Sequence, residues 1–149
     1  MTGDGVMERM IESTAAAARR EGGGYAFGIW PAHPRQLAPM RGELRRWLAP
    51  LAMTGETQED MILAANEAAA NSVEHAYPDA TEDDTVELVF WTEPDAVYVQ
   101  IIDHGLWQTP PTEPLERGRG IPVMRLLMDS VLIHHGPDGT TVFLRCSLA

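Results

Sequence analysis

Two polar side chains in a predicted helix have the types and spacing to handle a metal-bound phosphate. Glu67 and Asn71 are four residues apart, so they share one face of that helix, and the small neighbours Ala68 and Ala70 leave room for a ligand. A carboxylate beside an amide oxygen fits a general base next to a Mg²⁺ ligand, because Mg²⁺ takes one or two protein oxygens and fills its octahedron with phosphate and water. Taken alone, the pair also fits a solvated helix face.

A further carboxylate ends a predicted strand. The strand over residues 96–102 stops at Asp103-His104-Gly105. A carboxylate there can accept a hydrogen bond from an exocyclic amino group such as that of adenine, and Gly105 lets a ligand ring lie against bare backbone. The same residues also form an ordinary turn signal.

Two short glycine motifs and one histidine complete the candidates. Gly118-Arg119-Gly120 precedes a predicted helix, whose free amides and dipole favour a phosphate, although by itself the motif is more typical of a plain helix entry. Gly139-Thr140 lies in a predicted hairpin turn that needs no ligand. His75 extends the face of Glu67 and Asn71, and we interpret it as structural because nothing supplies the other ligands of a metal site.

Apolar spacing predicts the elements that position these residues. Strands are expected at 25–30, 85–91, 96–102, 131–133 and 141–148, helices at 37–51, 57–76 and after Gly120, and a Pro-rich loop at 105–118. This order predicts an α+β fold, a sandwich of a mixed, mostly antiparallel sheet with helices on one face. Residues 1–24 are interpreted as a mobile tail, with a docking element as the alternative, and residues 25–149 as one domain.

Composition excludes several classes of protein. The 11 Lys+Arg against 22 Asp+Glu give a net charge of −11, which argues against a nucleic-acid partner because backbone binding needs a basic face. All 11 basic residues are Arg, so a P-loop and a eukaryotic-type protein kinase are excluded, since both need a Lys on the phosphates. The single Cys146 and the lack of an 18-residue apolar run predict a cytoplasmic protein outside the membrane.

The four motifs occur in one order that resembles a known superfamily. Glu67-Ala-Ala-Ala-Asn71, Asp103-His-Gly105, Gly118-Arg-Gly120 and Gly139-Thr140 resemble the N, G1, G2 and G3 boxes of the GHKL ATPases, which have the Bergerat, histidine-kinase-like ATP-binding fold. The runs Leu63-Ala-Ala-Asn-Glu67 and His75-Ala-Tyr77 are most similar to bacterial anti-sigma-factor serine-protein kinases. The sequence departs from the pattern at Ala70, where Thr is usual, and at Trp107, where Gly is frequent.

The resemblance implies a role for each residue and a set of partners. Glu67 would be the catalytic base, Asn71 the Mg²⁺ ligand and Asp103 the adenine-binding carboxylate. The remaining pocket residues would be Gly105, Arg117, Gly118, Arg119, Gly120 and Thr140, with the arginines steadying the phosphates of ATP. Family members of this kind bind a sigma factor and phosphorylate a serine of an antagonist, a STAS-domain anti-anti-sigma factor.

The expectation is therefore a Mg²⁺-ATP-dependent serine kinase that forms a homodimer, with the strand at 25–30 and the helix bearing Leu44 and Trp47 as candidate contacts. One alternative is a nucleotide-gated binding module that sequesters a sigma factor or another regulator without phosphotransfer. Another is the ATP lobe of a sensor histidine kinase, which would act on a separate chain because residues 1–24 contain no His.

Overall fold

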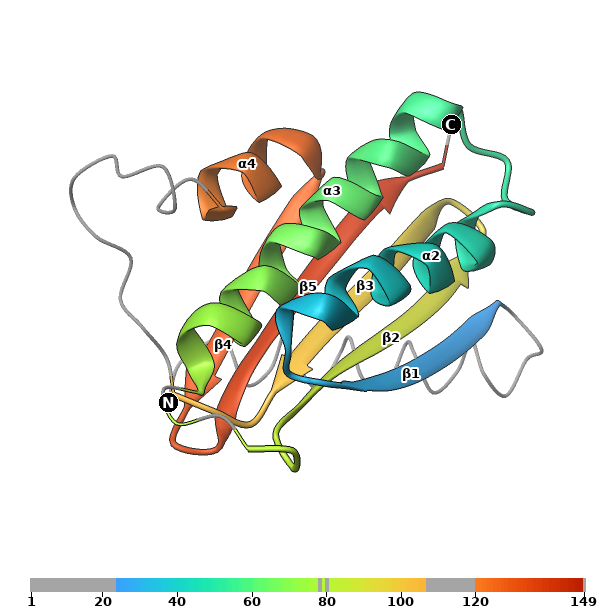
Figure 1. Cartoon of the computed structure of the whole chain (residues 1–149). Coiled ribbons are helices and arrows are strands. Elements are labelled where there is room, and N and C mark those ends of the chain that lie inside the picture. The colour runs from blue at the N-terminus through green and yellow to red at the C-terminus, as the bar shows by residue number, and fades with distance from the viewer. Residues whose placement is uncertain (1–23, 78, 80, 107–119, 149) are drawn as a thin grey trace.

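The computed structural model describes residues 24–77, 79, 81–106 and 120–148. Figure 1 shows a single sheet whose one face carries the helices labelled α2, α3 and α4. In chain order the elements are β1 (Tyr25–Pro31), a 3₁₀ turn η1 (Pro34–Gln36), α2 (Leu37–Leu48), α3 (Gly55–Asn71), a π-helical turn η2 (Ser72–Ala76), β2 (Thr85–Glu93), β3 (Ala96–Asp103), α4 (Gly120–Leu127), β4 (Ser130–Gly136) and β5 (Gly139–Ser147).

The sheet has five strands in the order β1-β2-β3-β5-β4. All four pairings between the described strands are antiparallel, and the helices lie on one face of the sheet, so the predicted α+β sandwich with a mostly antiparallel sheet is confirmed. The register sets Asp103 at the end of β3 opposite Thr140 at the start of β5. Two candidate site residues from distant parts of the sequence are thereby neighbours.

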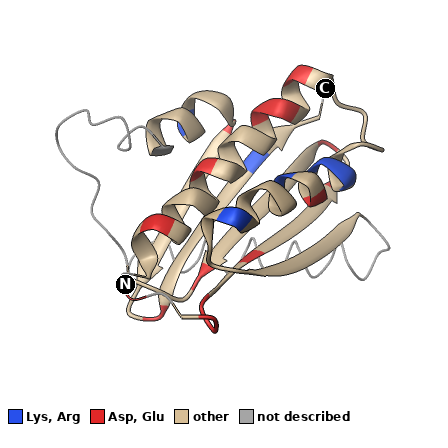
Figure 2. Cartoon of the chain, viewed as in Figure 1, with Lys and Arg blue, Asp and Glu red and all other residues tan. Residues whose placement is uncertain are grey.

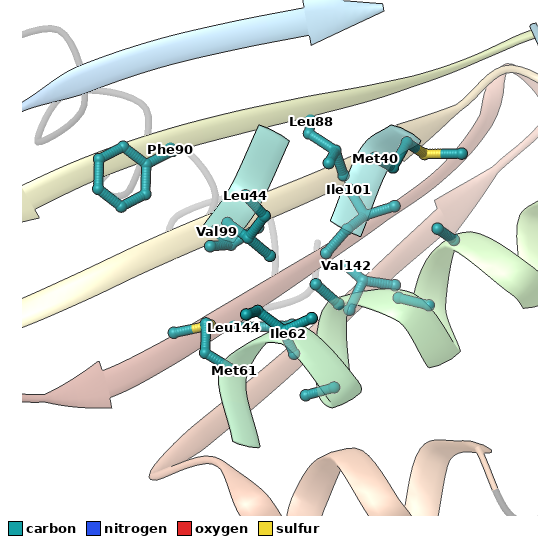
Figure 3. Close-up of a cluster of buried hydrophobic side chains, with 14 of the residues drawn as sticks. Met40, Leu44, Met61, Ile62, Leu88, Phe90, Val99, Ile101, Val142 and Leu144 are labelled. Carbon is teal, nitrogen blue, oxygen red and sulfur yellow. The ribbon is translucent and has the colours of Figure 1, made fainter. Parts of the chain in front are cut away.

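The helix layer packs on the sheet through small and aliphatic side chains. α2 buries Met40, Leu44 and Leu48 at intervals of four residues, as expected for one face of a helix. Four alanines of α3, Ala64, Ala65, Ala68 and Ala69, are buried and let this helix lie close to the strands. Figure 3 shows how the two helices and the sheet contribute to one core, with labelled side chains from Met40, Leu44, Met61, Ile62, Leu88, Phe90, Val99, Ile101, Val142 and Leu144.

Two helix boundaries differ from the prediction. α3 begins at Gly55, because the hydroxyl of Thr54, rather than that of Thr57, caps it by accepting the Thr57 backbone N–H at 3.1 Å. α2 ends at Leu48, before the predicted end at residue 51.

Most charged side chains of α2 are basic, whereas those of α3 are acidic. Figure 2 shows basic residues on α2 and acidic residues along α3. Arg45 and Glu59 form an ion pair between the two helices at 3.3 Å, and Arg46 pairs with Glu43 within α2. Because these pairs are exposed, each contributes about 0–1 kcal/mol, and the core carries most of the stability of the sandwich.

Candidate functional site

Three segments meet at one end of the sandwich. Figure 1 shows the C-terminal end of α3, the end of β3 and the β4–β5 hairpin gathered there. The hydroxyl of Ser72, the first residue of η2, donates a hydrogen bond of 2.7 Å to Oδ2 of Asp103 and lies 3.3 Å from the Ala68 carbonyl oxygen. This bond joins the helix that carries the candidate base and metal ligand to the strand that carries the candidate adenine contact.

Asp103 is the buried centre of this end, with 4% of its surface exposed. Its Oδ1 accepts the backbone N–H of Gly105 at 3.1 Å and that of Thr140 at 3.2 Å. A carboxylate offers about four acceptor positions, and the described residues fill three of those on Asp103. One acceptor position of this carboxylate therefore has no partner among the described residues, on a side chain that its neighbours hold in place.

Two glycines allow the backbone to pack tightly around Asp103. A Cβ on Gly105 would lie 2.2 Å from the carbonyl oxygen of Ala76, and the next residue, Leu106, donates its N–H to that same oxygen at 2.7 Å. Gly139 has a φ of +134°, and a Cβ there would lie 2.0 Å from the Asp103 carbonyl oxygen. Both positions therefore need glycine for a structural reason.

The π-helical turn leads to a tyrosine that holds the segment after β3. The Tyr77 hydroxyl donates to the Thr85 carbonyl oxygen at 2.8 Å and accepts the His104 backbone N–H at 2.7 Å. Burial raises the pKa of Tyr77, the bond from His104 opposes that rise, and the nearby Asp103 charge adds to it. The hydroxyl therefore stays protonated and keeps both bonds at neutral pH. Single π turns inside helices are frequent at functional sites.

Glu67 and Asn71 leave their polar atoms available. Both are half-buried, and no hydrogen bond or ion pair joins either side chain to another residue that the structure describes. Asn71 directly precedes Ser72, so the bond from Ser72 to Asp103 brings this end of α3 next to the strand that carries Asp103. Within the described ranges, no group of three or more His, Cys, Asp or Glu could hold a metal ion. An Asn oxygen that shares a cation with phosphates suits Mg²⁺ in such a setting.

The structure tests the placement of most of the predicted residues. It gathers Asn71, Asp103, Gly105 and Thr140 at one end of the sandwich, with Glu67 one helical turn away along α3. Gly120 opens α4, which packs against α3. Arg117, Gly118 and Arg119 lie outside the described residues.

Sequence reasoning gave no role to Ser72 or to the hydroxyl of Tyr77. A small hydroxyl residue directly after Asn71 was the available signal for Ser72. His75 is half-exposed, with Nε2 3.6 Å from a carboxylate oxygen of Glu74, and its structural role stays a prediction.

A family model described as the histidine kinase-like ATPase domain matches residues 30–146. The chain belongs to this family. It is thus an ATP-binding domain of the α+β class, and its fold is that of ATP-using kinases. The resemblance to the GHKL ATPases is confirmed at the level of the family.

Solved structures with the same fold support the family assignment. The chain is similar to the structure of the RsbU and RsbW domains of Rv1364c from Mycobacterium tuberculosis, with 25% identity, a TM-score of 0.65 and 83% of this chain covered. This ATPase domain spans only 32% of that longer chain. The histidine kinase domain of the blue-light activated histidine kinase EL346 from Erythrobacter litoralis matches with 18% identity, a TM-score of 0.54, and coverage of 75% of this chain and 59% of that one. The latter match concerns the fold alone.

None of the helices in the described parts of the chain is both long and apolar enough to cross a membrane.

Proposed function

We propose that this ATPase domain is a Mg²⁺-ATP-dependent serine-protein kinase and anti-sigma factor, which binds a sigma factor and phosphorylates a STAS-domain antagonist. The observation that carries the proposal is the half-buried carboxylate of Glu67, which has no partner among the described residues and lies one helical turn before the end of α3, where Ser72 binds the buried Asp103. The motif resemblance and the similarity to a structure that contains an RsbW domain support the choice of this class of kinase.

The adenine end of ATP fits the surroundings of Asp103. The free acceptor position of this carboxylate suits the exocyclic amino group of adenine, which is a donor. Guanine presents a carbonyl at the corresponding edge, and two acceptors would then face each other. The site should therefore select adenine nucleotides over guanine nucleotides.

The phosphate end fits the last turn of α3, which precedes Ser72. The amide oxygen of Asn71 would hold Mg²⁺, with phosphate and water oxygens as the other ligands. When bound, ATP would supply the phosphoryl group, and Mg²⁺ would neutralise part of the phosphate charge. In the proposal, the backbone amides at residues 118–120, together with Arg117 or Arg119, steady the phosphates.

Glu67 would act on the protein substrate. Its carboxylate has no partner among the described residues and would accept the proton of the attacking serine hydroxyl, and half-burial on a helix orients it. The magnitude typical of general base catalysis, about 10²- to 10⁴-fold, sets the loss expected when this carboxylate is replaced.

The test is transfer of labelled phosphate from ATP to a serine of a co-purified STAS-type partner. Glu67→Gln should bind the nucleotide nearly normally and transfer phosphate about 10²- to 10⁴-fold more slowly. Glu56→Gln makes the same chemical change in the exposed first turn of α3 and should transfer at the wild-type rate. If the wild-type protein binds ATP and its partner but transfers nothing, and Glu67→Gln behaves identically, a nucleotide-gated binding module replaces the kinase.

Two further expectations from the resemblance belong to this proposal. A homodimer should give twice the mass of one chain by light scattering at micromolar concentration, and a monomeric mass would count against it. A cytoplasmic location follows from the proposed partners, and recovery of the native protein outside the cytoplasm would contradict it.

A further inference from the structure

The face of the sheet opposite the helices carries its own apolar cluster. Val89, Trp91 and Phe143 are buried there, and the partly buried side chains packed around them are Tyr25, Tyr98, Ile102 and Leu132. Figure 1 shows α2, α3 and α4 on the other face, where their buried residues join the main core. None of the described helices therefore covers this second face.

Trp91 is the residue on this face whose surroundings are least complete. Its ring stacks on Tyr98 with 5.0 Å between centroids and 2° between planes, and 0% of the residue is exposed. Its buried indole N–H has no hydrogen-bond partner among the described residues. Because a buried indole N–H usually finds an acceptor, another part of the protein or a partner is expected beside it.

The chain enters the fold at the edge of this cluster. Gly24 is held to the end of β2, since its N–H donates to Oγ1 of Thr92 at 3.1 Å and its carbonyl oxygen accepts the Thr92 N–H at 2.9 Å. The register then sets Tyr25 opposite Trp91, and Trp91 opposite Tyr98. The 23 residues before Gly24 therefore join the sheet directly beside Trp91.

The sequence of that segment has the pattern of a helix with one apolar side. Apolar positions at spacings of three and four are interrupted by charged and polar ones, and the stripe comprises Met7, Met10, Ile11 and Thr14, with Glu8, Arg9, Glu12 and Ser13 on the other side. A helix over residues 6–20 would be about 22 Å long. Five strands span four gaps of about 4.8 Å, roughly 19 Å, so such a helix is long enough to cross the sheet.

We propose that residues 6–20 dock as an amphipathic helix on the second face of the sheet, with the Met7, Met10 and Ile11 stripe against Trp91, Val89 and Phe143. This would make the domain a three-layer structure, in which the N-terminal segment is a docking element in its own chain. Thr14 on the same stripe offers an oxygen that can accept the indole N–H. The inference is independent of the proposed kinase activity, because it concerns the face that the nucleotide site does not use.

The first test compares two substitutions in the full-length chain by urea unfolding. Ile11→Asp places a charge on the proposed docking stripe and should raise the unfolding equilibrium constant at least about tenfold, since burial of an Ile side chain contributes that much. Ser13→Asp introduces the same residue on the opposite side and should leave the unfolding midpoint unchanged. Equal midpoints for the wild-type protein and Ile11→Asp would overturn the docking.

The second test identifies the occupant of the face. A nitroxide is attached at Ser13→Cys in a Cys146→Ala background, and broadening of the Trp91 indole and Leu132 amide signals is followed by ¹⁵N NMR, with the indole signal assigned from its absence in Trp91→Phe. Docking in the same chain predicts broadening that is lost when Ile11→Asp is added. Broadening that survives Ile11→Asp would show an undocked tail and overturn the proposal.

A mixed sample separates the chain's own segment from a second copy. Nitroxide-labelled ¹⁴N protein is combined with unlabelled ¹⁵N protein, and the proposal predicts no broadening in this sample. Broadening there would assign the face to another copy of the chain. If neither sample shows broadening, a different partner covers this face. Broadening in the mixed sample and the lack of broadening in both samples would each overturn the proposal.

Discussion

Asp103→Asn separates the ligand-binding role of this carboxylate from its role in the fold. In the variant, the Asn oxygen can keep both backbone N–H groups, of Gly105 and Thr140, that now lie 3.1 and 3.2 Å from Oδ1. The amide nitrogen can donate to Ser72 Oγ, whose own hydrogen then turns to the Ala68 carbonyl oxygen at 3.3 Å. Every internal partner of Asp103 is therefore satisfied, and the free energy of unfolding should change little.

The ligand position changes its character in the same variant. In Asp103 the fourth position is an acceptor. In the variant, the second N–H of the amide occupies this position, so a donor would face the amino group of adenine. The lost charge-assisted hydrogen bond should weaken ATP binding by about 1.5–3 kcal/mol, roughly 10- to 150-fold in Kd. The preference for ATP over GTP should fall with it.

Calorimetric titration of ATP and GTP, beside a urea unfolding curve, measures both effects. Asp129→Asn is the matched control, because Asp129 also accepts a backbone N–H, from Ser147, at the other end of β5, roughly 23 Å from Thr140. This control should bind ATP like the wild-type protein. An Asp103→Asn protein that unfolds normally and binds ATP with unchanged affinity would refute the adenine assignment.

Three further predictions follow from the same contacts. Gly139→Ala should lower the unfolding free energy by about 1–3 kcal/mol in a denaturant titration, because φ is +134° and the new Cβ would lie 2.0 Å from the Asp103 carbonyl oxygen. Tyr77→Phe should lower the free energy of unfolding by about 1–3 kcal/mol in a denaturant titration near pH 7, because the Thr85 carbonyl and the His104 N–H lose their partner. Because burial raises the pKa of Tyr77 above 10.0, the difference between the wild-type protein and the variant should shrink as the pH rises past that value. Cys146 should react slowly with iodoacetamide at pH 8 in the folded protein and fast in urea, because burial raises the pKa of its thiol.

Local patterns predicted the elements well because each depends on neighbouring residues. The spacing of Leu44 and Leu48 and the hairpin at Gly136–Gly139 are readable within a few positions of the chain. The helix start was predicted at residue 57 rather than at Gly55, because Thr54 and Thr57 both carry hydroxyls there and backbone geometry decides which of them caps the helix. The strand order and the antiparallel direction of each described pairing depend on which distant segments pair, which local spacing does not encode.

The candidate site shows the same division between local and long-range information. The spacing of Glu67 and Asn71 on one helix was readable, whereas the bond from Ser72 to Asp103 joins residues 31 positions apart. The second apolar face was also hidden, because β2 is buried on both sides: Leu88 and Phe90 join the main core while Val89 and Trp91 face away from it. A strand of this kind has no polar side whose alternation would reveal which face is covered.

The central claim, that this end of the sandwich binds Mg²⁺-ATP with divided roles for Asn71 and Glu67, is tested most directly by ATP titration with and without Mg²⁺. We expect Mg²⁺ to tighten ATP binding to the wild-type protein and to Glu67→Gln, and to have no such effect on Asn71→Ala. Asn66→Ala, which removes a neighbouring amide that accepts from Arg41 at 2.8 Å, should keep the full effect of Mg²⁺. An Asn71→Ala protein whose ATP affinity still rises with Mg²⁺ as in the wild type would contradict the account.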